Sequence, residues 1–236
     1  MCGRFTLRTP VRRVAEIFDL PDTLELLPHY NIAPTQQVPV VRANPDSGRR
    51  ELVLLHWGLI PPWADDPSIG NRMINARAET LSTKRAFRDA FRSRRCLVVS
   101  DGFYEWRRRG RKKQPYYITR SGGEPLALAG LWERWSRDDA RIESCTIVTT
   151  DANDLVRPLH DRMPLVIEPR DFDLWLDPQI TDPQRLESLL KPFPADELTL
   201  HPVGARVNDP RHDSPDCIQS VEPAEPQRSG WLFDVD

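Results

Sequence analysis

The sequence predicts a single α+β domain whose main element is a strongly bent, mostly antiparallel sheet. Three observations support this prediction. The chain has 236 residues, of which 39% are hydrophobic, and this is enough for one packed core. Apolar or β-branched runs recur along the chain between turns that contain Gly or charged residues, a pattern typical of antiparallel strands. Segments with apolar residues at helical spacing are short, so short helices are expected to flank the sheet.

The first predicted element is a short amphipathic helix. Thr9 is placed to cap it, Pro10 suits its first turn, and apolar residues recur at helical spacing from Val11 to Phe18. Residues 29–36 (HYNIAPTQ) are predicted to form an irregular loop. Two strands are predicted on either side of a turn-forming segment that contains Asn, Pro, Asp and Gly, at 38–42 and 52–57.

A rigid aromatic segment comes next. Residues 57–63 (WGLIPPW) combine two tryptophans with two prolines. Such a segment suits either a plug in the core or a wedge beside a binding surface, and the sequence leaves both alternatives open.

The rest of the chain alternates predicted strands with short helices. The strands are apolar or β-branched runs at 96–100, 116–119, 126–132, 144–149 and 165–167. Helices are predicted at 82–92 with Ser82 or Thr83 as cap, from Asp151 to Val156, and at 183–190. From about Asn208 the chain is rich in Pro, Asp, Ser and Glu, which predicts a loop and then a tail that is mobile unless residues 231–233 dock. We therefore place one domain at 1–220 and a C-terminal tail at 221–236.

Composition narrows the classes of protein. No apolar run approaches the roughly 20 residues needed to cross a bilayer, and the N-terminus lacks the features of a signal peptide, so we expect a soluble cytoplasmic protein. The four cysteines stand far apart, at 2, 96, 145 and 217, with no CxxC pair, which argues against a zinc knuckle or a disulfide framework. Cys96 and Cys145 lie in apolar runs and are expected in the core.

Charge is unevenly distributed along the chain. The formal net charge is −2, yet residues 72–113 contain 14 Lys or Arg and four acidic residues, a balance of +10, so the remainder carries −12. This separation predicts a basic face able to hold a polyanion. A solvated charged helix and a hairpin tip would explain the same pattern equally well.

The most reactive group predicted lies at the N-terminus. Removal of Met1 leaves Cys2 with an amine and a thiol on adjacent carbons. Such a 1,2-aminothiol can attack an aldehyde twice, because the amine forms an imine and the thiolate then closes a five-membered thiazolidine. The structural alternative is an incidental cysteine near a frayed terminus.

Three further polar motifs have no evident role in a core. Asn75 and Arg77 are two residues apart, so extended backbone projects them to one side, and an arginine so placed suits a phosphate. Glu105 lies among aromatic residues (GFYEW), where desolvation raises a carboxyl pKa and favours proton transfer. His160 precedes Arg162 in HDRMP, and histidine ordinarily titrates near neutrality. Taken singly, a capped turn, a surface glutamate and a hydrogen-bonded histidine are the structural alternatives.

Together these residues resemble the SOS-response-associated peptidase (SRAP) family, whose members cover abasic sites in single-stranded DNA by crosslinking to them. The motifs that carry the resemblance occur in the family's order: MCGRF at 1–5, YNIAPTQ at 30–36, WGLIPPW at 57–63, NARAET at 75–80, GFYEW at 102–106 and HDRMP at 160–164. The resemblance implies a compact α+β fold on a bent, barrel-like sheet. It also implies a basic groove that carries single-stranded DNA across the site of Cys2.

The resemblance also implies roles for particular residues. The nucleophile corresponds to Cys2, the positioning amide to Asn75, the acid/base carboxyl to Glu105 and the histidine to His160. The phosphate contacts correspond to Arg4, Arg77 and Arg162, and the aromatic DNA contacts to Trp106 and Trp63. The segment 107–113 is expected to be a hairpin tip. No metal or organic cofactor is implied. The expected partner is single-stranded DNA with an abasic site, including such DNA at replication forks or junctions. The protein is expected to be a monomer and to associate with the nucleoid when it is bound to DNA.

Two other functions remain open at this point. Cys2 can be the N-terminal nucleophile of a cysteine peptidase or amidohydrolase, with its own amine as the base. Alternatively, the basic segment and the aromatic residues can form a non-covalent reader of single-stranded or modified DNA. For the crosslinking function that the resemblance implies, autoproteolytic removal of Met1 and an associated DNA lyase activity are further expectations.

Overall fold

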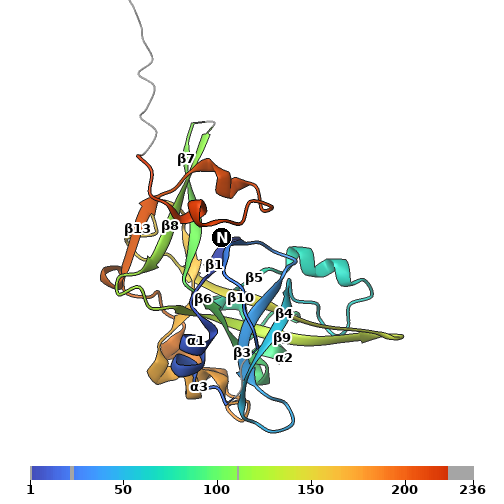
Figure 1. The fold of residues 1–236 in the computed structure, drawn as a ribbon. Helices are drawn as coiled ribbons and strands as arrows, with labels where there is room; N and C mark the ends of the chain where they lie inside the picture. The colour runs from blue at the N-terminus through green and yellow to red at the C-terminus, as the bar shows by residue number, and fades with distance from the viewer. Residues whose placement is uncertain (1, 22–23, 111, 223–236) are drawn as a thin grey trace, which may run out of the picture.

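The computed structural model describes residues 2–21, 24–110 and 112–222, and its centre is a closed, five-stranded barrel (Figure 1). The barrel strands are β3 (Gln37–Ala43), β4 (Arg50–Trp57), β6 (Arg95–Ser100), β9 (Leu126–Arg137) and β10 (Ala140–Asp151). They pair in the order β10-β4-β3-β6-β9, and β9 pairs back onto β10. The β10–β4 pair is parallel and the others are antiparallel. Closure leaves these strands few unpaired edges.

Short strands extend the barrel where its long strands run past their partners. β5 (Asn75–Arg77) pairs in parallel with β10, and β11 (Arg162–Pro164) pairs antiparallel with the last residues of β10. β12 (Val166–Ile167) pairs with β9. The long β10 therefore brings residues near 75 and residues near 162 to the same end of the barrel.

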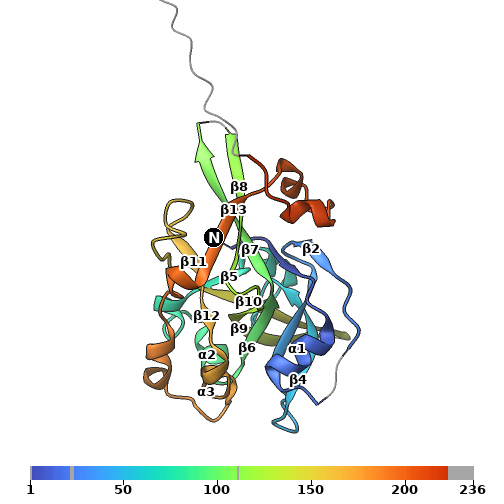
Figure 2. The same ribbon diagram turned by 60° about the vertical axis from the view of Figure 1, so that its left-hand side comes forward.

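A second, antiparallel sheet lies against that end. Its order is β13-β8-β7-β1-β2, with strands β1 (Phe5–Leu7), β2 (His29–Ile32), β7 (Gly102–Arg109), β8 (Lys112–Arg120) and β13 (Leu198–Pro202). The β7–β8 hairpin projects beyond the body of the molecule, and the N-terminus lies at its base (Figures 1 and 2).

The α-helices gather at the other end of the barrel (Figure 1). They are α1 (Val11–Phe18), α2 (Arg88–Ser93) and α3 (Phe172–Leu176). Short 3₁₀ helices occupy the connections, at Pro67–Arg72, Ala78–Thr80, Pro169–Asp171, Pro183–Leu189, Ala195–Glu197, Ala205–Asn208 and Pro215–Ile218. Among the described residues, no helix has the length and apolar character to cross a membrane.

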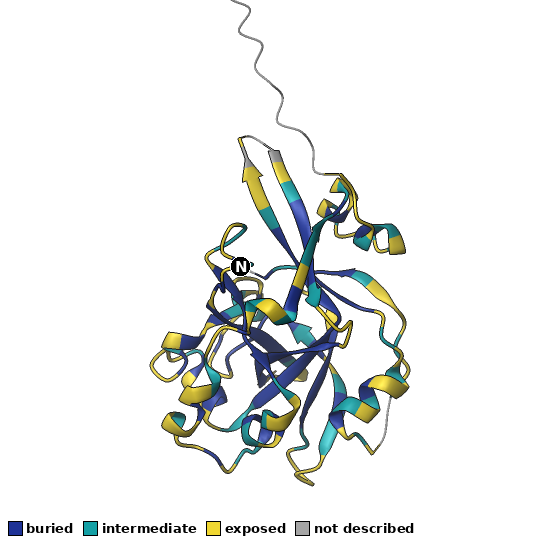
Figure 3. Ribbon diagram, turned by 90° about the vertical axis from the view of Figure 1, so that its left-hand side faces the viewer, coloured by how far each residue is buried: buried dark blue, intermediate teal, exposed yellow. Residues whose placement is uncertain are grey.

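The barrel strands carry the core (Figure 3). Every residue of β6 is buried, because one of its faces points into the barrel and α2 and α3 contact the strand. Trp57 and Trp175 are fully buried, and each donates its indole N–H to a backbone carbonyl, of Ile74 and Cys96 respectively. Cys96 and Cys145 are buried in this core, as expected.

The predicted α+β fold with a bent, mostly antiparallel, barrel-like sheet is confirmed. The first helix and the predicted strands are present, several of them longer than expected. In residues 57–63, Leu59 and Ile60 are buried, as a core plug requires. Trp63 is 43% exposed, and a wedge beside a binding surface stays a prediction. Gly58 makes the turn possible: its φ is +142°, and a Cβ there would lie 2.6 Å from the carbonyl oxygen of Gly70.

Four local predictions are wrong. Thr9 does not cap the first helix, because its hydroxyl donates to Asp101. Residues 29–36 are not all irregular, because 29–32 form β2 at the edge of the second sheet. Of the predicted helix 82–92, only 88–92 are α-helical, as part of α2 (Arg88–Ser93), and the preceding residues form turns in which Leu81 and Phe87 are buried.

The fourth correction concerns the segment after β10. No helix runs from Asp151 to Val156, because Asp151 ends β10 and binds Arg162, and Asn153 instead accepts a hydrogen bond from the backbone of Val156. The predicted late helix at 183–190 is present as the 3₁₀ helix Pro183–Leu189. Residues 231–233 lie outside the described part of the chain.

Candidate functional site

Cys2 is buried at the base of the β7–β8 hairpin. Gly3 and Arg4 link it to β1, which pairs with β7 through Phe5 opposite Phe103. The backbone N–H of Tyr104 continues the pairing by donating to the carbonyl of Arg4. This register sets Cys2 beside the part of β7 that carries Glu105. Cys2 has no exposed surface in the chain that retains Met1.

Asn75 holds the backbone of Cys2. Its position is set by β5, in which Asn75 pairs with Ile147 of β10. The side-chain Nδ2 donates to the carbonyl of Cys2 at 2.9 Å. The Oδ1 of the same amide is buried and has no hydrogen-bond partner within the described residues. Asn75 therefore fixes the terminus and keeps one acceptor available beside it.

Glu105 is a buried carboxyl at the same place. Strand alternation puts Phe103 and Glu105 on one face of β7 and Tyr104 and Trp106 on the other. Burial raises the pKa of Glu105, and the nearby charge of His160 opposes part of that rise. Burial also raises the pKa of the Cys2 thiol, and the Glu105 charge adds to it. The expectation that Glu105 has a raised pKa is confirmed.

His160 stands at the end of the loop between β10 and β11. The backbone N–H of Arg162 donates to its Nδ1 at 2.9 Å, so Nδ1 acts as an acceptor and the ring proton of the neutral form is on Nε2. The Asp161 carboxylate lies 2.8 Å from the same Nδ1. The Nδ1 side of the ring is therefore occupied by the neighbouring residues 161 and 162.

An open cavity of about 500 Å³ is lined by Glu105 and His160. Its lining combines the two proton-transfer candidates with basic hairpin residues and two loop residues: Glu105, Trp106, Arg107, Arg108, Lys113, Pro158, Leu159 and His160. The volume lies in the range of small-molecule sites, about 300–1,000 Å³. The cavity can admit a sugar and its phosphate next to Glu105.

The three arginines predicted to contact DNA differ in their surroundings. Arg77 is exposed and makes no side-chain hydrogen bond or ion pair within the described residues. Arg162 is buried and bonds to Asp151 and Glu79 at 2.6 and 2.7 Å. A phosphate would have to displace one of these carboxylates, so the DNA contact of Arg162 stays a prediction that requires rearrangement.

Arg4 is held by the C-terminal part of the chain. Its guanidinium donates to the side chain of Asn31 and to the carbonyl of Val207, both at 2.8 Å, and to the carbonyl of Asn208. The buried Asn31 amide donates in turn to three carbonyls of the same segment. Arg4 therefore links the residues next to Cys2 to residues 207–212.

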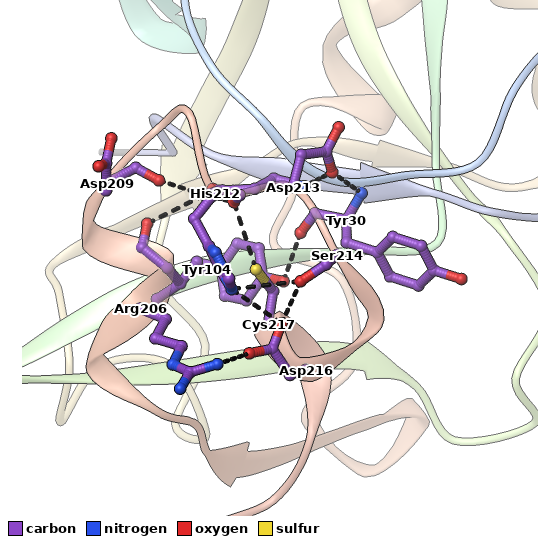
Figure 4. Close-up of polar contacts among 11 residues, drawn as sticks. Tyr30, Tyr104, Arg206, Asp209, His212, Asp213, Ser214, Asp216 and Cys217 are labelled. Atoms are coloured by element: carbon purple, nitrogen blue, oxygen red, sulfur yellow. Dashed lines mark hydrogen bonds and ion pairs between the residues drawn. The ribbon is translucent and has the colours of Figure 1, made fainter.

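A dense polar network fixes that C-terminal segment on β2 and β7 (Figure 4). Asp213 accepts the backbone N–H groups of Tyr30 and Asn31, and the Tyr104 hydroxyl donates to the carbonyl of Tyr30. The network also brings potential metal ligands within 4.8 Å of one another, from His212, Asp216 and Cys217. Since Arg206 and Ser214 already bond to the Asp216 carboxylate, we assign this cluster a structural role.

The two predicted aromatic contacts lie on different parts of the site. Trp106 is half-buried at the cavity wall, and its indole donates to Asn208 at 2.7 Å. Trp63 is exposed, with the Arg85 guanidinium 4.6 Å from its ring centre. Trp63 does not line the cavity that contains Glu105, so its role as a DNA contact also stays a prediction.

Sequence reasoning missed two features of the site. Arg107, Arg108 and Lys113 were identified only as part of a hairpin tip, although they line the cavity. Asn31 was quoted within YNIAPTQ without a role, and its long-range bonds have no sequence signature. The positive charge balance of residues 72–113 was the sequence signal that could have pointed to the cations lining the cavity.

The chain was also compared with known proteins. A sequence model described as "SOS response associated peptidase (SRAP)" matches residues 1–210. The chain is 44% identical to the abasic site processing protein YoqW of Bacillus subtilis over 93% of this chain and 100% of that protein. It is 31% identical to the abasic site processing protein YedK of Escherichia coli, over 94% and 100% of the two chains. A crystal structure of a protein from Bacteroides thetaiotaomicron superposes with a TM-score of 0.84 at 26% identity, covering 93% of this chain and 100% of that one.

Proposed function

The chain belongs to the SOS response associated peptidase family, and from this premise we propose that it processes abasic sites in single-stranded DNA by forming a covalent thiazolidine through Cys2. The protein would thereby shield the lesion during a DNA-damage response. Its relatives YoqW and YedK are named as abasic site processing proteins, which supports the substrate.

The observation that carries the proposal is the set of contacts around Cys2. Asn75 bonds to its carbonyl, Glu105 is close enough to raise its thiol pKa, and His160 is close enough to influence Glu105. These residues come from four separate segments of the chain. The reaction needs an N-terminal aminothiol, an acid and a histidine; Glu105 and His160 line one cavity, and Cys2 lies next to Glu105.

The first step is the opening of the abasic sugar, which is mostly a closed hemiacetal. A proton must reach the ring oxygen while another leaves the C1′ hydroxyl. The raised pKa of Glu105 keeps its carboxyl protonated at a pH where an exposed glutamate has ionised, so it can donate the first proton. His160 can accept the second through a ring nitrogen.

The second step is attack on the C1′ aldehyde by the α-amine of Cys2, which Met1 removal exposes. An α-amine ordinarily has a pKa of about 7.7–8.0, below that of a thiol at about 8.5. Burial raises the thiol pKa further, so the amine is the better first nucleophile. Loss of water gives the imine, and the thiol then adds across it: sulfur bonds to C1′ and the proton goes to nitrogen.

Several finer features belong to the same proposal. Arg4, Arg77 and Arg162 would contact phosphates, and Trp106 and Trp63 would contact the nucleotides beside the lesion. Fork or junction DNA would be bound by the monomer, in the cytoplasm and on the nucleoid. Met1 removal would be autoproteolytic. A lyase activity would follow if the imine lost its 2′ proton and the 3′ phosphate departed before ring closure.

The test compares three forms of the protein: native, N-terminally blocked, and Cys2→Ser with Met1 removed. Each is incubated with abasic single-stranded DNA, with and without borohydride, and the products are weighed by intact-mass spectrometry. We expect a heat-stable adduct for the native protein, none for the blocked protein, and a borohydride-dependent adduct for Cys2→Ser.

The blocked protein decides between mechanisms, because it keeps the thiol and loses only the basic amine. A stable adduct on the blocked protein would sink the aminothiol mechanism. Hydrolysis of peptide or amide substrates by the native protein without any DNA adduct would instead support a cysteine peptidase.

A further inference from the structure

Near its tip, the β7–β8 hairpin concentrates positive charge along the cavity that contains Glu105. Arg107, Arg108 and Lys113 all line it. Glu105 is the sole carboxylate among the lining residues, and burial keeps its pKa raised. The cavity wall therefore carries a net positive charge next to the reaction centre.

Two of these cations are direct cross-strand partners. Arg108 of β7 stands opposite Lys113 of β8, and such partners point to the same face of a hairpin. Like charges in this arrangement destabilise a sheet. Within the described residues, neither Arg108 nor Lys113 makes an ion pair or a side-chain hydrogen bond, and the same holds for Arg107. Arg42 on β3, by contrast, bonds to both Glu51 and Glu143. The arrangement is unfavourable in the free protein and becomes favourable when an anion lies between the two side chains.

We propose that Arg108 and Lys113 form a phosphate subsite that binds the backbone of the DNA strand beside the abasic nucleotide. The inference rests on the proposed function and adds a contact surface that neither Arg4 nor Arg162 supplies, since both are engaged inside the protein. The subsite would position the sugar over Glu105 and His160, which share its cavity.

The chemistry of the subsite favours a phosphodiester. An arginine fork matches the oxygens of a phosphate, and a lysine adds a point charge. The cations follow a two-stranded ribbon that leads away from the body of the molecule (Figure 2). A ribbon of this kind suits successive phosphates of a strand. Inorganic phosphate offers the same oxygens without the chain, and a competition experiment separates the two.

The first experiment measures binding to an undamaged single strand at several salt concentrations, so that it does not depend on adduct formation. The variant is Arg108→Gln/Lys113→Gln, and the matched control is Arg12→Gln/Arg49→Gln. The control removes an exposed cation from α1 and another from the β3–β4 turn, and both elements lie at the end of the barrel away from the hairpin (Figure 1). We expect the slope of log K against log salt to fall by about 0.7 for each lost phosphate contact, or about 1.4 in all. The control should keep the slope of the native protein.

The same variants are unfolded by heat to separate binding from structure. Removing the facing cations should leave the melting temperature of the variant unchanged or slightly higher, because a like-charge pair is lost. A native slope for the hairpin variant, or an equal loss for the control, would overturn the subsite. So would competition by inorganic phosphate as strong as that of the oligonucleotide.

A second experiment locates the contact. Abasic oligonucleotides carry one neutral methylphosphonate at successive positions on either side of the lesion, and the rate of adduct formation is measured at subsaturating protein. One position should slow the native protein and not the hairpin variant, which has already lost that contact. Equal slowing of both proteins at every position contradicts the subsite. If the native protein forms no adduct at all, the proposed function fails while the salt series still decides the subsite.

Discussion

Both ends of the barrel bury charged side chains, but the hydrogen bonding of the buried groups differs between the two ends. At the helical end, Arg95 is 2% exposed and each of its donor nitrogens bonds to a backbone carbonyl, of Phe91, Arg92, Trp175 and Asp177. At the hairpin end, Glu105 is 3% exposed with a raised pKa, and the buried Oδ1 of Asn75 has no partner among the described residues. The buried charge of Arg95 is fully satisfied, as in a structural site, whereas a perturbed carboxyl beside an unpaired acceptor is typical of candidate functional sites.

The largest effect expected from this comparison is at the helical end. Arg95→Met should lower the free energy of unfolding by about 3–5 kcal/mol, because it leaves buried carbonyls without donors. Urea denaturation measures the loss. Arg92→Met, at an exposed position of the preceding helix α2, is the control and should change stability little. Equal losses in the two variants would show that burial of Arg95 carries no special weight.

The next effect is at the hairpin end and concerns rate. Glu105→Gln should slow adduct formation by about 10²–10⁴-fold, the usual contribution of a proton-transfer group. Because burial raises the pKa, the acid form of Glu105 persists below that raised pKa and is lost as the pH rises through it. The native rate should therefore show an alkaline limb that Glu105→Gln lacks, in single-turnover kinetics across pH.

Glu105→Gln should have the opposite effect on stability. The folded state holds the Glu105 proton more tightly than the unfolded state, so native stability falls as the pH rises from the ordinary glutamate pKa to the raised one. Glutamine removes this loss. At neutral pH the variant should unfold at an equal or higher urea concentration than the native protein. A less stable variant would contradict the view that this end gives up stability for chemistry.

A smaller effect is expected at Asn75. Asn75→Ala removes the bond to the Cys2 carbonyl but also a buried oxygen without a partner, so the free energy of unfolding should change by no more than about 1 kcal/mol. Adduct formation should slow on the order of 10-fold to 100-fold, because the terminus is less well placed. Stability and rate measured on one preparation check both. A large stability loss with an unchanged rate would assign Asn75 to structure.

The smallest effect is at Arg77, which has no partner to lose within the described residues. Arg77→Ala should leave unfolding within about 0.5 kcal/mol of native. It should lower the salt slope of single-strand binding by about 0.7, for strands of any sequence. Filter binding on two unrelated sequences gives the result, and a sequence-dependent loss would exclude a plain phosphate contact.

Local pattern was enough to predict most of the barrel. The apolar runs that became β6 and β9 have strong strand preferences, and their burial on both faces agrees with them. The helix expected at 82–92 failed because Phe87 is better buried by a turn than by a full helix, a tertiary effect that spacing cannot show. Similarly, threonine is a residue type that often caps helices, but the Thr9 hydroxyl donates to the Asp101 carboxylate instead.

The site was predictable only in part. Cys2, Glu105 and His160 could be picked out by their chemistry and by the resemblance, and Asn75 by its position in an extended segment. Their arrangement depends on β10, which joins segments far apart in sequence. The pairing of Arg162 with Glu79 and Asp151 could not be foreseen from the sequence. An arginine two residues after a histidine is as consistent with phosphate binding as with a salt bridge.

The link between Arg4 and Val207 spans 203 residues of sequence, and this has a consequence for how the protein is made. A ribosome exports Arg4 almost first and Val207 almost last, at about 5–20 residues per second. For most of synthesis, the guanidinium that will anchor the N-terminal strand lacks the carbonyls that hold it. The Arg4 guanidinium can therefore make these bonds only after residues near 207 have been synthesised. The last part of the domain to be made thus completes the attachment of the first part.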